Sequence, residues 1–144
     1  MPTTRRTRTI DASPEELWSV VADPHHLPRW WPRVTRVEGV EEEGFTIVLA
    51  TDRGRMVRAD QRVVESVAPR VRTWTQELEG TPFARLLREA RTTIELTPDE
   101  PGTRVSLELR QAMRGISRLG GFLVSRAARR QLDAALHDLE RIVG

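Results

Sequence analysis

Few side chains in this sequence can transfer protons near neutral pH. Three of the 144 residues are histidines, His25, His26 and His137, and cysteine, tyrosine and lysine do not occur. The missing cysteines exclude thiol nucleophiles, disulfides and cysteine-ligated metals. A general base would therefore have to be a histidine or a carboxylate with a raised pKa. Adjacent histidines point in different directions on a helix and make a poor metal pair, and no nucleotide or phosphate-binding motif occurs, so we expect neither a metal nor a cofactor.

The composition is that of a globular protein. Hydrophobic residues make up 38% and charged residues 31% of the chain, and the length suits one core, so we expect a single domain over residues 1–144. All 23 basic residues are arginine, yet the net charge is only +2. This favours a GC-rich bacterial genome over nucleic-acid binding. No apolar run reaches the roughly 18 residues of a membrane span, and the N-terminus lacks the apolar core of a signal peptide, so we expect a cytoplasmic protein with no integral membrane association.

The elements that must position any site begin with a strand over residues 3–10 and a capped helix. Ser13-Pro14-Glu15-Glu16 predicts a helix start, because its serine can cap the N3 amide, its proline fits the first turn and its second glutamate completes a capping box. Asp23-Pro24 ends this helix and starts a second short one, which Pro28 limits.

From residue 33 onward the pattern is one of strands separated by turn signals. Alternation is clearest over residues 103–113, where apolar residues recur at every second position. Short strands joined by short turns predict an antiparallel meander with one buried face. The last segment, residues 116–143, changes to helical spacing and would be about 40 Å long, enough to cross the sheet. The other predicted strands cover residues 33–40, 45–51, 55–67, 71–78 and 86–96.

One α+β arrangement satisfies this order: a seven-stranded curved antiparallel sheet wrapped around the long C-terminal helix, with the two short helices after strand 1 closing the open end. The layout, and especially Ile10-Asp11-Ala12-Ser13-Pro14-Glu15-Glu16-Leu17-Trp18 followed by Asp23-Pro24 and Trp30-Trp31-Pro32, resembles the START-like superfamily of helix-grip proteins. That superfamily includes polyketide cyclase/dehydrase-like (SRPBCC) proteins, plant pathogenesis-related allergens and lipid-transfer domains. The resemblance implies an internal cavity between the sheet and the C-terminal helix.

Alternation predicts which residues would face that cavity. Polar side chains on the inward faces could orient an otherwise apolar ligand, and the tryptophans offer flat surfaces for stacking. A strand-end position or a β-bulge would instead turn a polar residue to water, and a tryptophan could belong to the core. The predicted set is Trp30, Trp31, Ala59, Gln61, Trp74, Gln76, Arg88, Thr92 and Gln111, with Leu119, Leu123 and Ala127 on the last helix.

These residues favour binding over catalysis, so no catalytic residue is assigned. Two candidates stay open: His26, if it swings over the cavity mouth, and Glu77, if a bulge turns it inward. The other acids that alternation can place face outward (Asp60, Glu95, Glu108).

We therefore expect a binding protein for a hydrophobic small molecule: a lipid, a polyketide or an aromatic polycycle. The alternatives are a polyketide cyclase, aromatase or dehydratase that acts by templating and proton shuttling, and a protein-interaction module. Arg114 and Arg118, near the start of the last helix, leave open a peripheral contact with an anionic surface. The sequence does not determine the oligomeric state.

Overall fold

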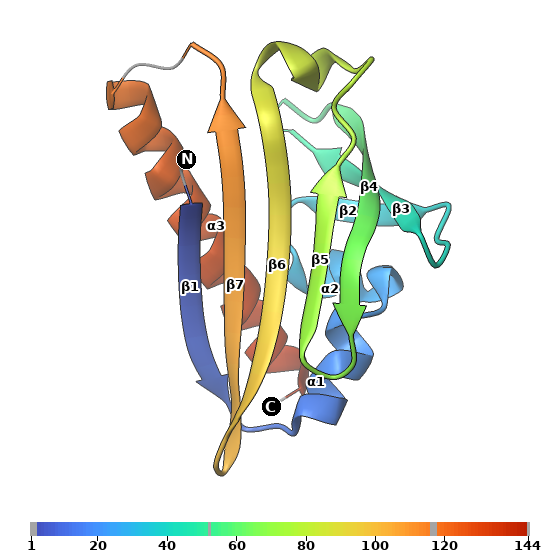
Figure 1. Ribbon diagram of the computed structural model, residues 1–144, viewed down its shortest axis with the longest axis vertical. Helices are drawn as coiled ribbons and strands as arrows, with labels where there is room; N and C mark the ends of the chain where they lie inside the picture. The colour runs from blue at the N-terminus through green and yellow to red at the C-terminus, as the bar shows by residue number, and fades with distance from the viewer. Residues whose placement is uncertain (1–2, 52, 116–117, 144) are drawn as a thin grey trace.

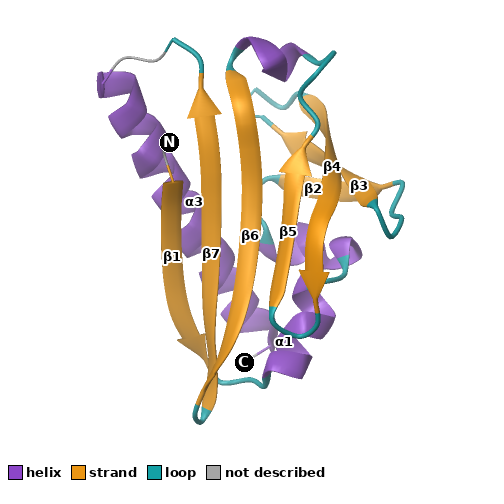
Figure 2. Ribbon diagram, in the orientation of Figure 1, coloured by secondary structure: helices purple, strands orange, loops and turns teal. Residues whose placement is uncertain are grey.

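The structure, a computed structural model, describes residues 3–51, 53–115 and 118–143. Within them the chain forms a seven-stranded antiparallel sheet in the order β1-β7-β6-β5-β4-β3-β2, with the three α-helices on one side (Figures 1 and 2). This is the predicted α+β helix-grip fold. The strands are β1 (Thr3–Ile10), β2 (Val34–Glu38), β3 (Gly44–Ala50), β4 (Met56–Val67), β5 (Val71–Gln76), β6 (Leu87–Asp99) and β7 (Gly102–Met113).

The short helices follow β1 and are held by side-chain caps. Ser13 Oγ accepts the backbone N–H of Glu16 at 3.1 Å at the start of α1 (Pro14–Val21), as predicted. Asp23 likewise caps the 3-10 helix η1 (Pro24–His26) by accepting the N–H of His25. Pro28 does not limit this segment as expected. It lies in the first turn of α2 (Leu27–Trp30), where a missing N–H costs no hydrogen bond.

The long helix α3 (Arg118–Val143) lies against one edge of the sheet. Leu132, Leu136 and Leu139 are fully buried, and α3 contacts β1 and β7. At the same edge, Arg6 of β1 donates to Asp133 at 2.9 Å, and Arg8 donates to Glu140 at 3.1 Å. Figure 1 shows α3 running behind β1 and β7. The helix is therefore anchored to the β1–β7 edge, while β3 to β5 lie away from it.

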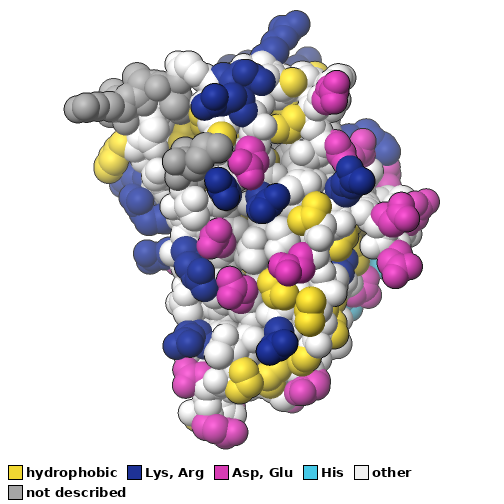
Figure 3. All heavy atoms as spheres, in the orientation of Figure 1, with side chains coloured by type: hydrophobic (Ala, Val, Ile, Leu, Met, Phe, Trp, Pro, Cys, Tyr) yellow, Lys and Arg dark blue, Asp and Glu magenta, His cyan; other side chains and the backbone are white. Residues whose placement is uncertain are grey.

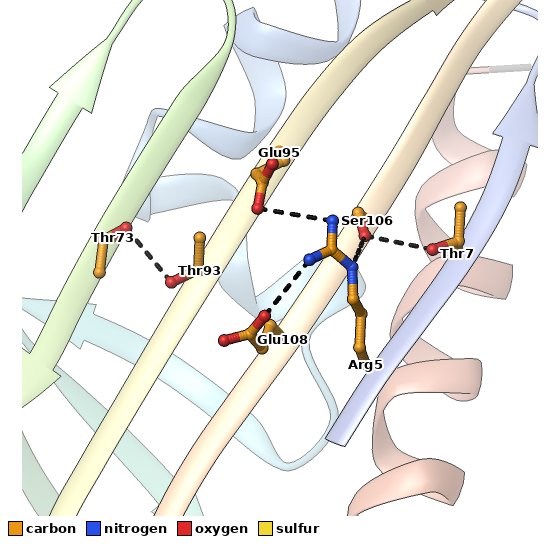
Figure 4. A network of polar contacts seen from close by, with 7 residues as sticks. All are labelled: Arg5, Thr7, Thr73, Thr93, Glu95, Ser106 and Glu108. Atoms are coloured by element: carbon orange, nitrogen blue, oxygen red, sulfur yellow. Dashed lines mark hydrogen bonds and ion pairs between the residues drawn. The ribbon is translucent and has the colours of Figure 1, made fainter. Parts of the chain in front are cut away.

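The outer face of the sheet carries a network of polar contacts. Arg5 Nε donates to Ser106 Oγ at 2.8 Å, and its guanidinium lies 3.5 Å from both Glu95 and Glu108 (Figure 4). In Figure 3, basic and acidic side chains are interspersed over this face, with hydrophobic side chains gathered over its lower part. The alternation of the strands thus leaves the opposite, concave face for the core and for any cavity.

The predicted strands differ from the structure where the pairing slips. The register shifts between Val63 and Glu65 in β4 and between Leu87 and Glu89 in β6. The strand β5 ends at Gln76, two residues before the predicted end, and β6 continues to Asp99, beyond its predicted end. A 3-10 helix, η2 (Pro82–Arg85), replaces the simple turn expected between them. These irregularities decide which residues face the cavity.

Candidate functional site

A cavity of about 1030 Å³ lies between the concave face of the sheet and α3. Its lining comes from β3 to β7 and α3, with further residues from the segment around α2 and from η2. The volume is just above the range of about 300–1,000 Å³ that is usual for small-molecule sites. The space exists because α3 packs on β1 and β7 and leaves the inner faces of the neighbouring strands uncovered.

Two tryptophans form an aromatic wall of the cavity. Trp74 points inward from β5, and its ring meets Phe45 edge-on at a centroid distance of 5.5 Å. Trp31, directly after α2, meets Trp74 edge-on at 6.2 Å. Both side chains are more than nine-tenths buried. The wall is therefore held by ring-to-ring contacts and can offer aromatic surface to a ligand.

Amide side chains supply most of the polar groups on the sheet side. Gln61 and Gln76 are direct cross-strand neighbours on β4 and β5, and both line the cavity. Gln111 lines it from β7, opposite Ala90. The Nε2 atom of Gln76 is buried without a hydrogen-bond partner among the described residues. A buried amide donor without a partner is costly, so this atom is suited to donate to a ligand.

One face of α3 is packed and another faces the cavity. The packed stripe consists of Ala128, Leu132, Ala135, Leu136 and Leu139, all buried. The residues of α3 that face the cavity, here called the cavity stripe, also recur at helical spacing, but after Leu123 they have only short or polar side chains. Its members are Leu123, Arg126, Ala127, Arg130, Gln131 and Ala134.

The lining has a one-sided charge. Among the described lining residues there are four arginines and no carboxylate. The arginines are Arg33, Arg91, Arg126 and Arg130. The charged side chains among the described lining residues are therefore all positive.

The structure brings most of the predicted site residues together. Eight of the twelve predicted cavity residues lie in the lining: Trp31, Gln61, Trp74, Gln76, Thr92, Gln111, Leu123 and Ala127.

Three predicted cavity residues lie elsewhere, and the side chain of a fourth is not among those described. Arg88 is exposed and outside the lining, because the register shift between Leu87 and Glu89 breaks the alternation on which its inward placement depended. Trp30 is 1% exposed and packs edge-on against Trp31 as part of the core. Ala59 is buried in the core beside the cavity, and the side chain of Leu119 lies outside the described residues.

Neither candidate for acid–base chemistry lies in the lining. His26 Nδ1 is 3.2 Å from Arg29 Nη1, and its Nε2 is 3.6 Å from Asp23. Glu77 is exposed just after β5. Partial burial raises the pKa of the Asp23 carboxyl, but hydrogen bonds from the backbone and side chain of His25, with the charges of His25 and His26, outweigh it and hold that pKa below its ordinary value.

Sequence reasoning missed the polar part of the helix stripe. Arg126 and Arg130 belong to a run of arginines that is typical of a solvated helix face, and Gln131 and Ala134 carry no signal of their own. Their spacing relative to Leu123 and Ala127 would have placed them on one face. Which face of the helix meets the cavity depends on the sheet register, which the sequence does not reveal.

The described part of the chain contains no cluster of three or more histidine, cysteine or acidic side chains that could hold a metal ion. In that part of the chain, none of the helices has the length and apolar character needed to cross a bilayer.

Solved structures of similar fold come from several bacteria. A conserved protein from Geobacillus kaustophilus is 17% identical, with a TM-score of 0.80 over 99% of this chain and 95% of that one. A START superfamily protein from Mycobacterium smegmatis is 15% identical, with a TM-score of 0.78 over 98% and 96% of the two chains. A protein from Thermus thermophilus is 23% identical, with a TM-score of 0.75 over 99% and 97%. At these identities the likeness shows the fold alone.

Comparison of the sequence with family models identifies the family of the chain. No curated protein sequence matches the chain significantly. A family model described as polyketide cyclase / dehydrase and lipid transport matches residues 1–144, the whole chain. The predicted polyketide cyclase/dehydrase-like branch is thereby confirmed, and the fold agrees with that of the START superfamily protein. The chain belongs to the polyketide cyclase / dehydrase and lipid transport family.

Proposed function

We propose that the protein binds a hydrophobic small molecule, a lipid, a polyketide or an aromatic polycycle, in the cavity between the sheet and α3. The observation that carries this proposal is the cavity of about 1030 Å³ with its apolar and aromatic lining and a few amide groups. Ligand sites commonly combine such a lining with a small number of polar groups that fix orientation. A cavity of this size does not favour the protein-interaction alternative, which suits a space filled by its own side chains.

The composition of the lining supports binding over catalysis. The described lining residues include no histidine, aspartate or glutamate. Arginine stays protonated at neutral pH, and amides donate and accept hydrogen bonds without exchanging protons usefully. The family description names both cyclase/dehydrase and lipid transport. Without an acid–base group at the ligand, the residues present can hold and orient a molecule but cannot shuttle its protons.

The experiment is a binding titration followed by tryptophan fluorescence, with a variant that fills the cavity. Trp31 and Trp74 line the cavity, so a bound apolar probe should change the emission with saturation. Ala127 lies on the exposed cavity stripe of α3, so Ala127→Phe adds bulk where the ligand would lie without disturbing the packed stripe. If the ring costs the complex the about 1–3 kcal/mol that extra bulk costs a packed site, the affinity should fall by about fivefold to about a hundredfold.

The control is His137→Phe, which places the same phenyl ring at an exposed position of α3 outside the lining. We expect it to leave the affinity unchanged. If fatty acids, sterols and polycyclic aromatics all fail to give a saturable response, the proposed function is wrong. Equal loss of affinity in both variants would also contradict it, because the effect would then not depend on the cavity.

A further inference from the structure

Two of the four arginines at the cavity have other roles. Arg91 comes from a strand position whose neighbours Ala90 and Thr92 line the inner face, and its guanidinium lies 3.9 Å from Glu89. Arg33 already interacts with another residue. The cations to be explained are therefore Arg126 and Arg130 on α3.

Arg126 and Arg130 are four residues apart on the cavity stripe of α3. Like charges at this spacing repel each other and weaken a helix. Neither guanidinium forms an ion pair with a carboxylate of the described residues, although other arginines of the chain do. The acids of α3 are engaged elsewhere: Asp133 with Arg6, Glu140 with Arg8 and Asp138 with Arg141. The cavity stripe thus presents two close positive charges without a described acid to balance them.

The remaining lining has a different character. Trp31, Trp74 and Leu109 offer apolar surface on the side of the sheet, and Gln131 adds an amide beside the two arginines. A guanidinium binds carboxylate and phosphate oxygens through charge-assisted hydrogen bonds. An uncharged apolar ligand would leave the two like charges unbalanced, whereas an acid group would pair with both.

We infer that the ligand is an amphipathic anion: its carboxylate or phosphate is bound by Arg126 and Arg130, and its apolar body lies against the tryptophans. This inference rests on the proposed function and names the class of ligand for the same cavity. It also identifies two positions, on one turn of α3, that determine specificity for the acid group.

The test compares ligands that differ only in their head group. A fatty acid, the fatty alcohol of the same chain length and the matching alkyl phosphate are titrated at low salt against the wild-type protein and the double variant Arg126→Gln/Arg130→Gln. Arg129→Gln is the matched control, since Arg129 is an exposed arginine of the same helix outside the lining. We expect the acid and the phosphate to bind about tenfold more tightly than the alcohol.

In the double variant this preference should disappear while the affinity for the alcohol is unchanged, and Arg129→Gln should keep the preference. The preference should also shrink at high salt, because Arg126 and Arg130 are exposed and salt screens their charges. If the alcohol binds as tightly as the acid and the double variant changes nothing, the inference fails and the proposed function stands. If no member of the series binds, the inference fails, and the proposed function fails with it when sterols and polycyclic aromatics also give no saturable response.

Vesicle sedimentation separates a free ligand from a membrane surface. Vesicles of phosphatidylcholine with and without phosphatidylglycerol are mixed with the same variants. Binding to the anionic vesicles that requires Arg126 and Arg130, with no preference for the free acid, would make the stripe a membrane contact and overturn the inference. A preference for the free acid without vesicle binding supports it.

Discussion

Trp74 and Trp30 are both buried tryptophans, but only Trp74 lines the cavity. We predict that both Trp74→Leu and Trp30→Leu lower the stability of the fold, but that Trp74→Leu weakens ligand binding much more than Trp30→Leu does. Trp74 is 5% exposed and Trp30 is 1% exposed, so the two changes remove similar buried surface. The two tryptophans differ in their surroundings, because the ring of Trp30 contacts only the core whereas the ring of Trp74 also lines the cavity.

The magnitude follows from the contacts of each ring. Trp74 meets Phe45 at 5.5 Å and Trp31 at 6.2 Å, and Trp30 meets Trp31 at 5.4 Å. Truncating a buried tryptophan to alanine costs about 3–5 kcal/mol, a large part of a typical stability of about 5–15 kcal/mol. Leucine keeps part of the apolar volume, so the loss should be smaller and the fold should survive. An aromatic stacking contact contributes about 0.5–1.5 kcal/mol beyond buried area, so the Kd for an aromatic ligand should rise by about two- to tenfold in Trp74→Leu.

Calorimetric titration measures the affinity, and urea denaturation measures the stability of the same samples. A polycyclic aromatic acid should lose more affinity than a fatty acid in Trp74→Leu, because only the aromatic ligand has a ring to stack. Unchanged affinity in Trp74→Leu, or an equal loss in Trp30→Leu, would refute the assignment of Trp74 to the cavity wall.

Two further predictions concern stability. A Cβ at Gly102 would overlap the backbone carbonyl oxygen of Ile10, whereas one at Gly121 in α3 meets nothing within 4 Å. In thermal denaturation, Gly102→Ala should therefore destabilise by about 1–3 kcal/mol, and Gly121→Ala should stabilise by about 0.5–1 kcal/mol; shifts of the same sign would contradict this. The pKa of Asp23 is lowered in the folded state, so its contribution is complete above the ordinary aspartate pKa and is lost as the pH falls through the folded value. The difference in urea stability between wild type and Asp23→Asn should therefore shrink as the pH drops below about 4, and a pH-independent difference would count against this role.

Most of the fold could be predicted because the strands alternate strictly where the sheet is regular. The segment around Val105 and Leu107 has its apolar residues at every second position, and both are fully buried in β7. The helix start at Ser13 was equally readable, because a cap is a local interaction of neighbouring residues. The order of strands and helices along the chain, with the long final helix, then left one topology that buries the apolar face of the sheet.

The site was less predictable because it depends on interruptions of that regularity. Gln61, Gln76 and Gln111 were placed in the cavity by alternation alone, and the structure has them there. Arg88 was misplaced because the bulge at this point of β6 is defined only by the pairing with β7. No pattern in the neighbouring residues predicts it. Arg126 and Arg130 line the cavity because α3 packs on β1 and β7 and leaves the strands opposite uncovered. This packing cannot be predicted from a local sequence pattern.

The cavity has a physical origin in where α3 is held. Its leucines are buried at the β1–β7 edge, with ion pairs from Arg6 and Arg8 alongside. On its other side, Ala127 and Ala134 are too short to fill the gap to the strands opposite. Larger apolar residues at these positions would close the gap and add buried surface, so packing alone does not account for the alanines. Nor does packing account for two like-charged arginines on the same stripe. Ala127 and Ala134 leave room beside the helix, and Arg126 and Arg130 place two positive charges on the same stripe. This arrangement is expected if a ligand with an apolar body and an acid group fills the cavity.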